Sequence, residues 1–197
     1  MVRVSRTNLQ YKLMDYTQHH RKSYIQIGAI YFWTATINNW MKLLIDDQYK
    51  DVIIQSLRYL SNTGKINVFA FVIMPNHIHL IWRVNAMNGK ETAQGSFLKY
   101  TAHEFRRLLL EQDSSGIVKY AVEAHNKQYE FWQRDSLATH FYSRSVAYQK
   151  LGYIHRNPTA KHWRLADDYI HYRYSSVRFY ELGEKDFDFL KDLREEF

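Results

Sequence analysis

Apolar residues recur along this 197-residue chain at two spacings, one of two residues and one of three to four. Three runs rich in β-branched and aromatic side chains indicate strands, namely residues 29–37, 66–74 and 77–84. Residues 46–60 and 97–109 place their apolar side chains at helical spacing. Pro75 and Asn76 form the turn between the second and third strands, because proline fixes φ and has no N–H to donate. The pattern predicts the order strand, helix, strand, strand, helix.

The second half of the chain completes this order. Residues 128–133 are the expected last strand, and a third helix is expected from about Ser143 to Arg156. The helix ends at Asn157, because Pro158 disfavours the α conformation of the residue before it. A βαββαβ order predicts an α+β fold with a ferredoxin-like (RRM-like) antiparallel sheet and helices on one face. The third helix is additional to that fold.

The length of the chain favours one domain over residues 1–197, with a core of about 25–180. Residues 1–24 form a basic lead-in, and residues 181–197 form an acidic tail. No cysteine is present, so a disulfide framework and a thiolate nucleophile are excluded. The N-terminus lacks the apolar segment of a secretory signal, and no apolar run approaches the roughly 18 residues of a membrane span. We therefore expect a cytoplasmic protein without a membrane partner.

The distribution of charge along the chain indicates a nucleic-acid partner. Residues 181–197 hold seven acidic and three basic groups, so the overall charge of +7 leaves +11 on residues 1–180. Basic and aromatic residues alternate there, a composition typical of proteins that pair with phosphates and stack on bases. The DNA-binding candidates are Trp132, Arg134, Arg156 and Tyr172. The seven glycines form no dinucleotide-binding or phosphate-loop pattern, so a nucleotide cofactor has no support.

His77 and His79 are the first candidates for chemistry. Residues two apart on a strand share a face, so these imidazoles lie roughly 7 Å apart along the strand. Two histidines on a solvated strand face are ordinary, but this run is apolar on both sides and is expected in the middle of the sheet. Buried histidines need partners, and a metal ion would supply them. A third ligand must come from elsewhere in the chain.

The end of the third helix offers that ligand. Tyr153 and Asn157 are four residues apart, so they lie one above the other with Cβ atoms roughly 6 Å apart. If this helix end faces the sheet, the Asn157 amide completes a metal site beside Tyr153. Arg156 is adjacent in sequence but is expected on another helix face. Tyr153 alone would be an ordinary packed aromatic among 16 tyrosines, and only the joint pattern favours a site.

These motifs resemble those of the single-tyrosine transposases of the HUH endonuclease class, in particular the REP-associated tyrosine transposases. The similarity covers roughly residues 25–180 and rests on four segments, residues 72–81, 131–134, 153–158 and 172–176. It implies His77, His79 and Asn157 as ligands of Mg2+ or Mn2+. It also implies Tyr153 as the nucleophile that forms a 5′-phosphotyrosine on single-stranded, hairpin-bearing DNA. Gly152 inside the helix, and residues 159–163 in place of a small-residue turn, depart from the family.

Other interpretations remain open at this point. A ferredoxin-like sheet is also the architecture of non-catalytic single-stranded nucleic-acid-binding modules. A replication initiator or relaxase would share the two histidines, but the short chain argues against it. The resemblance allows a monomer or an exchanged-helix dimer, and of these we expect the monomer. Tyr129 competes with Tyr153 because Gln133 follows four residues later, but a strand would separate that pair by roughly 13 Å.

Overall fold

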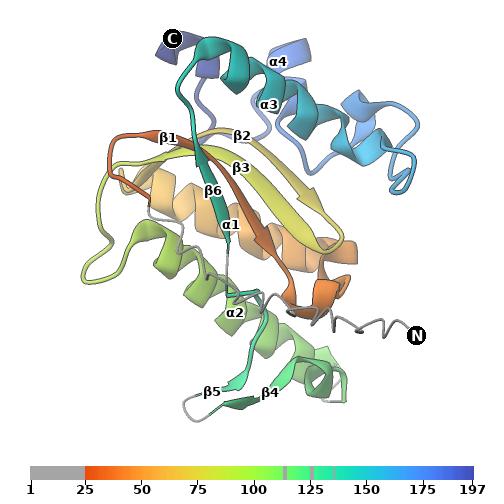
Figure 1. Ribbon diagram of the computed structural model, residues 1–197. Coiled ribbons are helices and arrows are strands. Elements are labelled where there is room, and N and C mark those ends of the chain that lie inside the picture. Colours follow the sequence, from red (N-terminus) through yellow and green to blue (C-terminus); the bar gives the residue numbers. More distant parts are fainter. Residues whose placement is uncertain (1–24, 113–114, 125–126, 135) are drawn as a thin grey trace, which may run out of the picture.

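The computed structural model describes residues 25–112, 115–124, 127–134 and 136–197 (Figure 1). The basic lead-in of residues 1–24 lies outside the described residues. The strands are β1 (Ile30–Thr36), β2 (Ile66–Met74), β3 (His77–Val84), β4 (Ala121–Ala124), β5 (Lys127–Tyr129) and β6 (Leu137–His140). The α-helices are α1 (Asp47–Asn62), α2 (Ala93–Gln112), α3 (Arg144–Arg156) and α4 (Val177–Leu182). None of the described helices combines the length and the apolar character needed to cross a membrane.

Four strands form the central sheet in the order β2-β3-β1-β6, with every neighbouring pair antiparallel. This order is that of a ferredoxin-like sheet, which confirms the predicted fold class. Helices α1 and α2 cover one face, and α3 and α4 lie on the other (Figure 1). The third helix is therefore an addition to the ferredoxin-like unit, as the sequence indicates, and it covers the face that α1 and α2 leave free.

The position of the last strand was predicted wrongly. Residues 127–129 form β5, which pairs with β4 in a separate two-stranded sheet, and the fourth strand of the main sheet is β6. The apolar Phe131 and Trp132 are buried under α2. Among the residues that the structure describes, a single bridge, between Ile37 and Trp132, joins their segment to the end of β1. The apolar run thus indicates burial against a helix, whereas β6 is half exposed and carries a weak strand pattern.

Aromatic side chains fill the core between the sheet and α2. Trp33 of β1 and Trp82 of β3 stack with ring centroids 4.9 Å apart, and Phe97 of α2 meets Trp33 edge-on at 5.7 Å. All three side chains are fully buried. Because strand side chains alternate, burying Trp33 on this face turns its neighbour Thr34 to the opposite face, which α3 covers.

The C-terminal segment packs along β2 at the edge of the sheet. Ile73 N–H donates to the Tyr174 carbonyl, and Ser176 N–H donates to the Phe71 carbonyl. The Tyr172 hydroxyl donates to the Ile73 carbonyl at 2.6 Å, and burial raises the pKa of Tyr172. The acidic tail is also anchored, since Glu196 forms an ion pair with Arg83. Tyr172 therefore holds the C-terminal segment on the sheet.

Trp132 is 6% exposed, and its Nε1 donates to Thr101 Oγ1 at 2.9 Å, so its ring has no free face for a base. We predict that Trp132→Ala lowers the free energy of unfolding by about 3–5 kcal/mol, because it leaves a cavity in the aromatic core. Leu137→Ala on β6, where the side chain is 63% exposed, is the control and should change it by less than about 0.5 kcal/mol. Urea unfolding measures both, and equal effects would contradict the burial of Trp132.

Candidate active site

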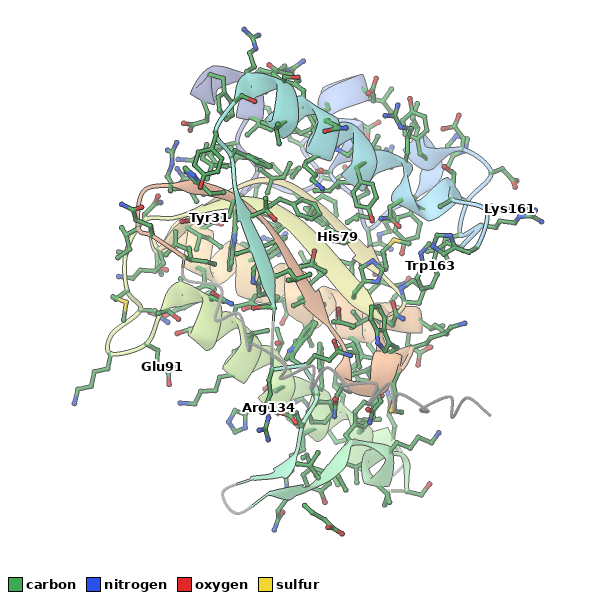
Figure 2. All side chains as sticks on the ribbon, in the orientation of Figure 1. Tyr31, His79, Glu91, Arg134, Lys161 and Trp163 are labelled. Atoms are coloured by element: carbon green, nitrogen blue, oxygen red, sulfur yellow. The ribbon has the colours of Figure 1, made fainter. Side chains whose placement is uncertain are left out.

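A pocket of about 750 Å³ opens between the sheet and the C-terminal end of α3. It is lined by all four residues of the predicted site, His77, His79, Tyr153 and Asn157. Figure 2 shows His79 on the α3 side of the sheet, and the ring centre of Trp163, from the loop after α3, lies 5.7 Å from that of His77. The end of the third helix therefore faces the sheet, which is the condition under which Asn157 could complete the site.

The strand register positions both histidines. Thr36 of β1 is opposite His77 of β3, and Thr34 is opposite His79. His77 Nδ1 lies 2.7 Å from Asn76 Oδ1, and His79 Nδ1 lies 2.7 Å from Thr34 Oγ1. An amide oxygen only accepts, so Nδ1 of His77 carries the proton and its Nε2 keeps a free lone pair. Both rings are held through Nδ1, which leaves both Nε2 atoms for other partners.

Burial keeps both rings neutral. It lowers the pKa of His77 to about 4, with a further contribution from the charge of His162. It lowers the pKa of His79 to about 3, with further contributions from His77 and Lys150. The two ring centroids are 4.6 Å apart. Two neutral imidazoles side by side are the form in which histidine binds a metal ion.

Helix α3 supplies the other two side chains. The helix begins after Ser143, whose Oγ accepts from the N–H of Val146 as an N-cap. One turn from its end, the Tyr153 hydroxyl lies 3.5 Å from His79 Nε2, and the side chain is 48% exposed. Asn157 is 8% exposed and begins a 3-10 turn that continues through Pro158. The Tyr153 hydroxyl therefore contacts His79, and Asn157 lines the same pocket as both imidazoles.

His77, His79 and Asn157 carry donor atoms of kinds that a divalent cation accepts. Within the described part of the chain, no group of three or more His, Cys, Asp or Glu side chains could hold a metal ion. A cation in this pocket would therefore depend on the Asn157 amide in addition to His77 and His79. Amide oxygen and imidazole are both ligands that Mn2+ accepts, and oxygen is the ligand that Mg2+ prefers.

Arg156 also lines this pocket, which corrects the expectation that it faces elsewhere. Its side chain folds back along the helix, so that a Cβ at Gly152 would lie 2.9 Å from Arg156 Nη2. Glycine at position 152 thus allows the guanidinium to lie over the helix, although glycine costs about 1 kcal/mol in a helix interior.

Trp40 was missed by sequence reasoning. It lies on the rim of the pocket with 62% of its side chain exposed, and its carbonyl accepts from Asn76 Nδ2 at 3.3 Å. Asn39 and Trp40 have φ values of 54° and 56°, a conformation that costs non-glycine residues roughly 1–2 kcal/mol each. Asparagine tolerates this conformation, so Asn39 is compatible with it from the sequence alone. At Trp40 the local sequence gives no such signal, because that residue is held by Asn76, which follows β2.

Three of the predicted DNA-binding residues lie outside the pocket. Trp132 is buried under α2, and the hydroxyl of Tyr172 is bonded to β2. Arg134 lies toward α2 (Figure 2), where it forms an ion pair with Glu130 at 3.1 Å. Of the four, only Arg156 is brought to the histidines.

The fold matches that of a transposase. A REP-associated tyrosine transposase solved in complex with a REP hairpin superimposes with a TM-score of 0.54 and 17% sequence identity, over 86% of this chain and 90% of that chain. A putative transposase from Deinococcus radiodurans R1 gives a TM-score of 0.40 and 15% identity, over 67% of this chain and 92% of that chain. No protein-family model matches the sequence. No curated protein matches it either. The superposition on the first of these two structures shows that the chain has the REP-associated tyrosine transposase fold.

Acid should destabilise the protein through its buried histidines. The pKa values of His77, His79 and His155 are about 4, 3 and 4, below the ordinary 6.5. Between pH 6.5 and about 4 the unfolded chain binds more protons, so the free energy of unfolding falls as the pH falls. Each histidine contributes up to about 1.4 kcal/mol per pH unit. Urea unfolding at several pH values measures this slope.

A pair of variants isolates the buried contribution. His79→Gln should reduce the slope between pH 6.5 and 4, whereas Leu137→Ala on the exposed side of β6, which removes no titratable group, should leave it unchanged. If both variants keep the wild-type slope, the burial of His79 does not control its protonation.

Proposed function

We propose that this protein cleaves and rejoins single-stranded DNA that carries a hairpin, with Tyr153 as the nucleophile. The observation that carries the proposal is the 3.5 Å approach of the Tyr153 hydroxyl to His79 Nε2, in one pocket with His77 and Asn157. The transposase fold supports a DNA-processing enzyme. A DNA hairpin as the partner follows from the neighbour that was solved with one, and from the charge of +11 on residues 1–180.

Mg2+ or Mn2+ is the proposed cofactor, with His77, His79 and Asn157 as its protein ligands. When bound, such a cation polarises a phosphate oxygen and offsets the negative charge that develops at phosphorus. Thr34 and Asn76 orient the imidazoles through Nδ1, which leaves Nε2 of each ring as the atom that would bind the cation. The burial that keeps both rings neutral makes them ready ligands at neutral pH.

Tyr153 performs the covalent step. Its hydroxyl loses a proton, the phenolic oxygen bonds to phosphorus, and the bond from phosphorus to the 3′ oxygen breaks, leaving a 5′-phosphotyrosine and, after proton uptake, a free 3′-OH. A phenol has a pKa near 10, so its developing charge needs stabilisation. Lys150 Nζ, 5.6 Å from the centre of the Tyr153 ring, contributes positive charge there. The phosphoester is conserved in the adduct, so a second 3′-OH can rejoin the strand without ATP.

Other side chains of the pocket would bind the DNA around the cleaved bond. Arg156 supplies a guanidinium for a neighbouring phosphate, and the exposed ring of Trp40 supplies a face for a base. The half-exposed Tyr153 allows the strand to enter from solvent.

The rival function, a non-catalytic binding module, has less support. Such modules stack bases on aromatic side chains across an open sheet face. Here α3 packs on that face, with Leu151 and Ile154 against Phe69 and Val72 in one buried cluster. The face that would receive RNA is therefore covered.

Tyr153→Phe removes only the hydroxyl, and it should eliminate the covalent protein–DNA adduct while leaving the fold and DNA affinity unchanged. The matched control is Tyr129→Phe, which should retain the adduct because Tyr129 lies against α2, outside the pocket. A labelled hairpin oligonucleotide with Mg2+ or Mn2+, denaturing gels and peptide mass spectrometry provide the measurement. An adduct on a peptide without Tyr153 would overturn the assignment of the nucleophile.

His79→Ala should abolish cleavage but leave DNA retention nearly intact, because phosphate contacts over the basic surface carry most of the affinity. Thr34→Val removes the hydrogen bond to His79 Nδ1, and it should weaken Mn2+ binding by about 10- to 100-fold. Electron paramagnetic resonance of free Mn2+ measures this affinity without reference to activity. Cleavage by His79→Ala in chelator-treated buffer would contradict the metal model.

A further inference from the structure

A second concave surface lies toward α2, on the other side of the sheet from the pocket. It has a volume of about 930 Å³ and runs between α2 and residues 128–134. We call it the α2 groove and define it by Lys99, His103 and Arg106 of α2, and by Tyr129 and Arg134 of the facing segment. None of these residues lines the pocket that contains Tyr153.

The α2 side of the groove is a stripe of basic side chains. Lys99, His103 and Arg106 are spaced by four and three residues, so they follow one face of the helix over roughly 10 Å. All three are exposed. Among the described residues that line the groove, Glu130 is the one carboxylate, and it is paired with Arg134. Lys99 forms an ion pair at 2.6 Å with Glu91, which lies outside the lining, so Arg106 is the cation of the groove without a carboxylate partner among the described residues. The groove therefore carries an excess of positive charge.

Arg106 and its neighbour Arg107 differ in their carboxylate partners. Arg107 forms ion pairs with Glu104 at 2.9 Å and with Glu111 at 2.8 Å. Within the part of the chain that the structure describes, Arg106 has no carboxylate partner, and its guanidinium lies 5.6 Å from the centre of the Tyr129 ring. An arginine that lies over an aromatic ring without a carboxylate partner keeps its N–H groups available for a phosphate.

The groove is connected to the active site through the end of β1. Asn38 N–H donates to the Phe131 carbonyl at 2.8 Å, and Gln133 N–H donates to the Thr36 carbonyl at 2.8 Å. Thr36 lines the pocket, while Phe131 and Gln133 line the groove. A DNA strand that leaves the pocket at this strand end therefore meets the wall of the groove.

We propose that the α2 groove binds the phosphodiester backbone of the DNA that flanks the cleaved segment. The stripe from Lys99 to Arg106 spans roughly 10 Å, which matches about three phosphates at the roughly 3.4 Å axial spacing of one B-form strand. DNA as the occupant rests on the proposed function, but binding in the groove needs neither Tyr153 nor the histidines. The groove would hold the substrate while the distant pocket performs the chemistry.

The test compares Arg106→Gln with Arg107→Gln, both in the Tyr153→Phe background so that binding alone is measured. Each variant loses one exposed positive charge from adjacent positions of α2. Two DNAs are used, a hairpin with long flanks and a short single strand that covers only the cleaved segment. Affinity is measured by fluorescence anisotropy over a salt series, with thermal unfolding to check that both variants fold.

Arg106→Gln should lower the slope of log affinity against log salt by about 0.7–0.9 on the long DNA, the value for one lost phosphate contact. Arg107→Gln should leave the slope unchanged, and neither variant should alter binding of the short strand. Equal slopes for the two variants on the long DNA, or an equal loss on the short strand, would overturn the proposal. An acidic peptide that competes with DNA only through Arg106 would also overturn it, in favour of a protein partner.

Adduct formation by proteins that keep Tyr153 separates this proposal from the catalytic one. If the wild type forms no adduct while Arg106→Gln still lowers the salt slope, the groove stands and the catalytic assignment fails. If the adduct forms on the short strand and the slopes of the two variants are equal, catalysis stands and the groove fails.

Discussion

The alternation of side chains along β1 and β3 is the constraint on which the rest of the molecule depends. On one face, Trp33 and Trp82 stack and receive Phe97 from α2. On the other face, one residue along, Thr34 lies opposite His79 and bonds its Nδ1. A slip of one residue in this register would turn the tryptophans to α3 and the histidine into the aromatic core. The packing of one face therefore specifies the chemistry of the other.

Burial has opposite consequences for the two kinds of residue on this sheet. Burial of the tryptophans stabilises the folded protein, because it removes a large apolar surface of each ring from water. For His77 and His79 burial disfavours the charged form, and Asn76 and Thr34 compensate by bonding Nδ1 of each ring. The result is a pair of neutral imidazoles held through Nδ1, with Nε2 of His79 3.5 Å from the hydroxyl of Tyr153, on a helix that is itself packed on the sheet. A site held in this way needs little reorganisation to bind a cation or a phosphate.

The sheet also separates two concave surfaces. The pocket beside α3 holds the histidines and Tyr153, and the groove beside α2 holds a stripe of exposed basic side chains. The end of β1 is hydrogen bonded to residues 131 and 133 and so joins the two surfaces. Separate surfaces allow affinity and chemistry to change independently, because screening by salt acts on exposed cations far more than on buried imidazoles.

Sequence alone determined the parts of this protein that depend on local periodicity. The two-residue period placed His77 and His79 on one face, the four-residue spacing placed Tyr153 beside Asn157, and the element order indicated the ferredoxin-like sheet. Tertiary structure decided what the remaining residues do. Trp132 pairs with Ile37 and is covered by α2, Tyr172 bonds to β2, Arg156 folds over Gly152, and Trp40 is held on the rim by Asn76. Most of these outcomes depend on a partner distant in sequence, and even Arg156 lies in the pocket only because the end of α3 meets the sheet. A pattern of neighbouring residues carries no information about such contacts.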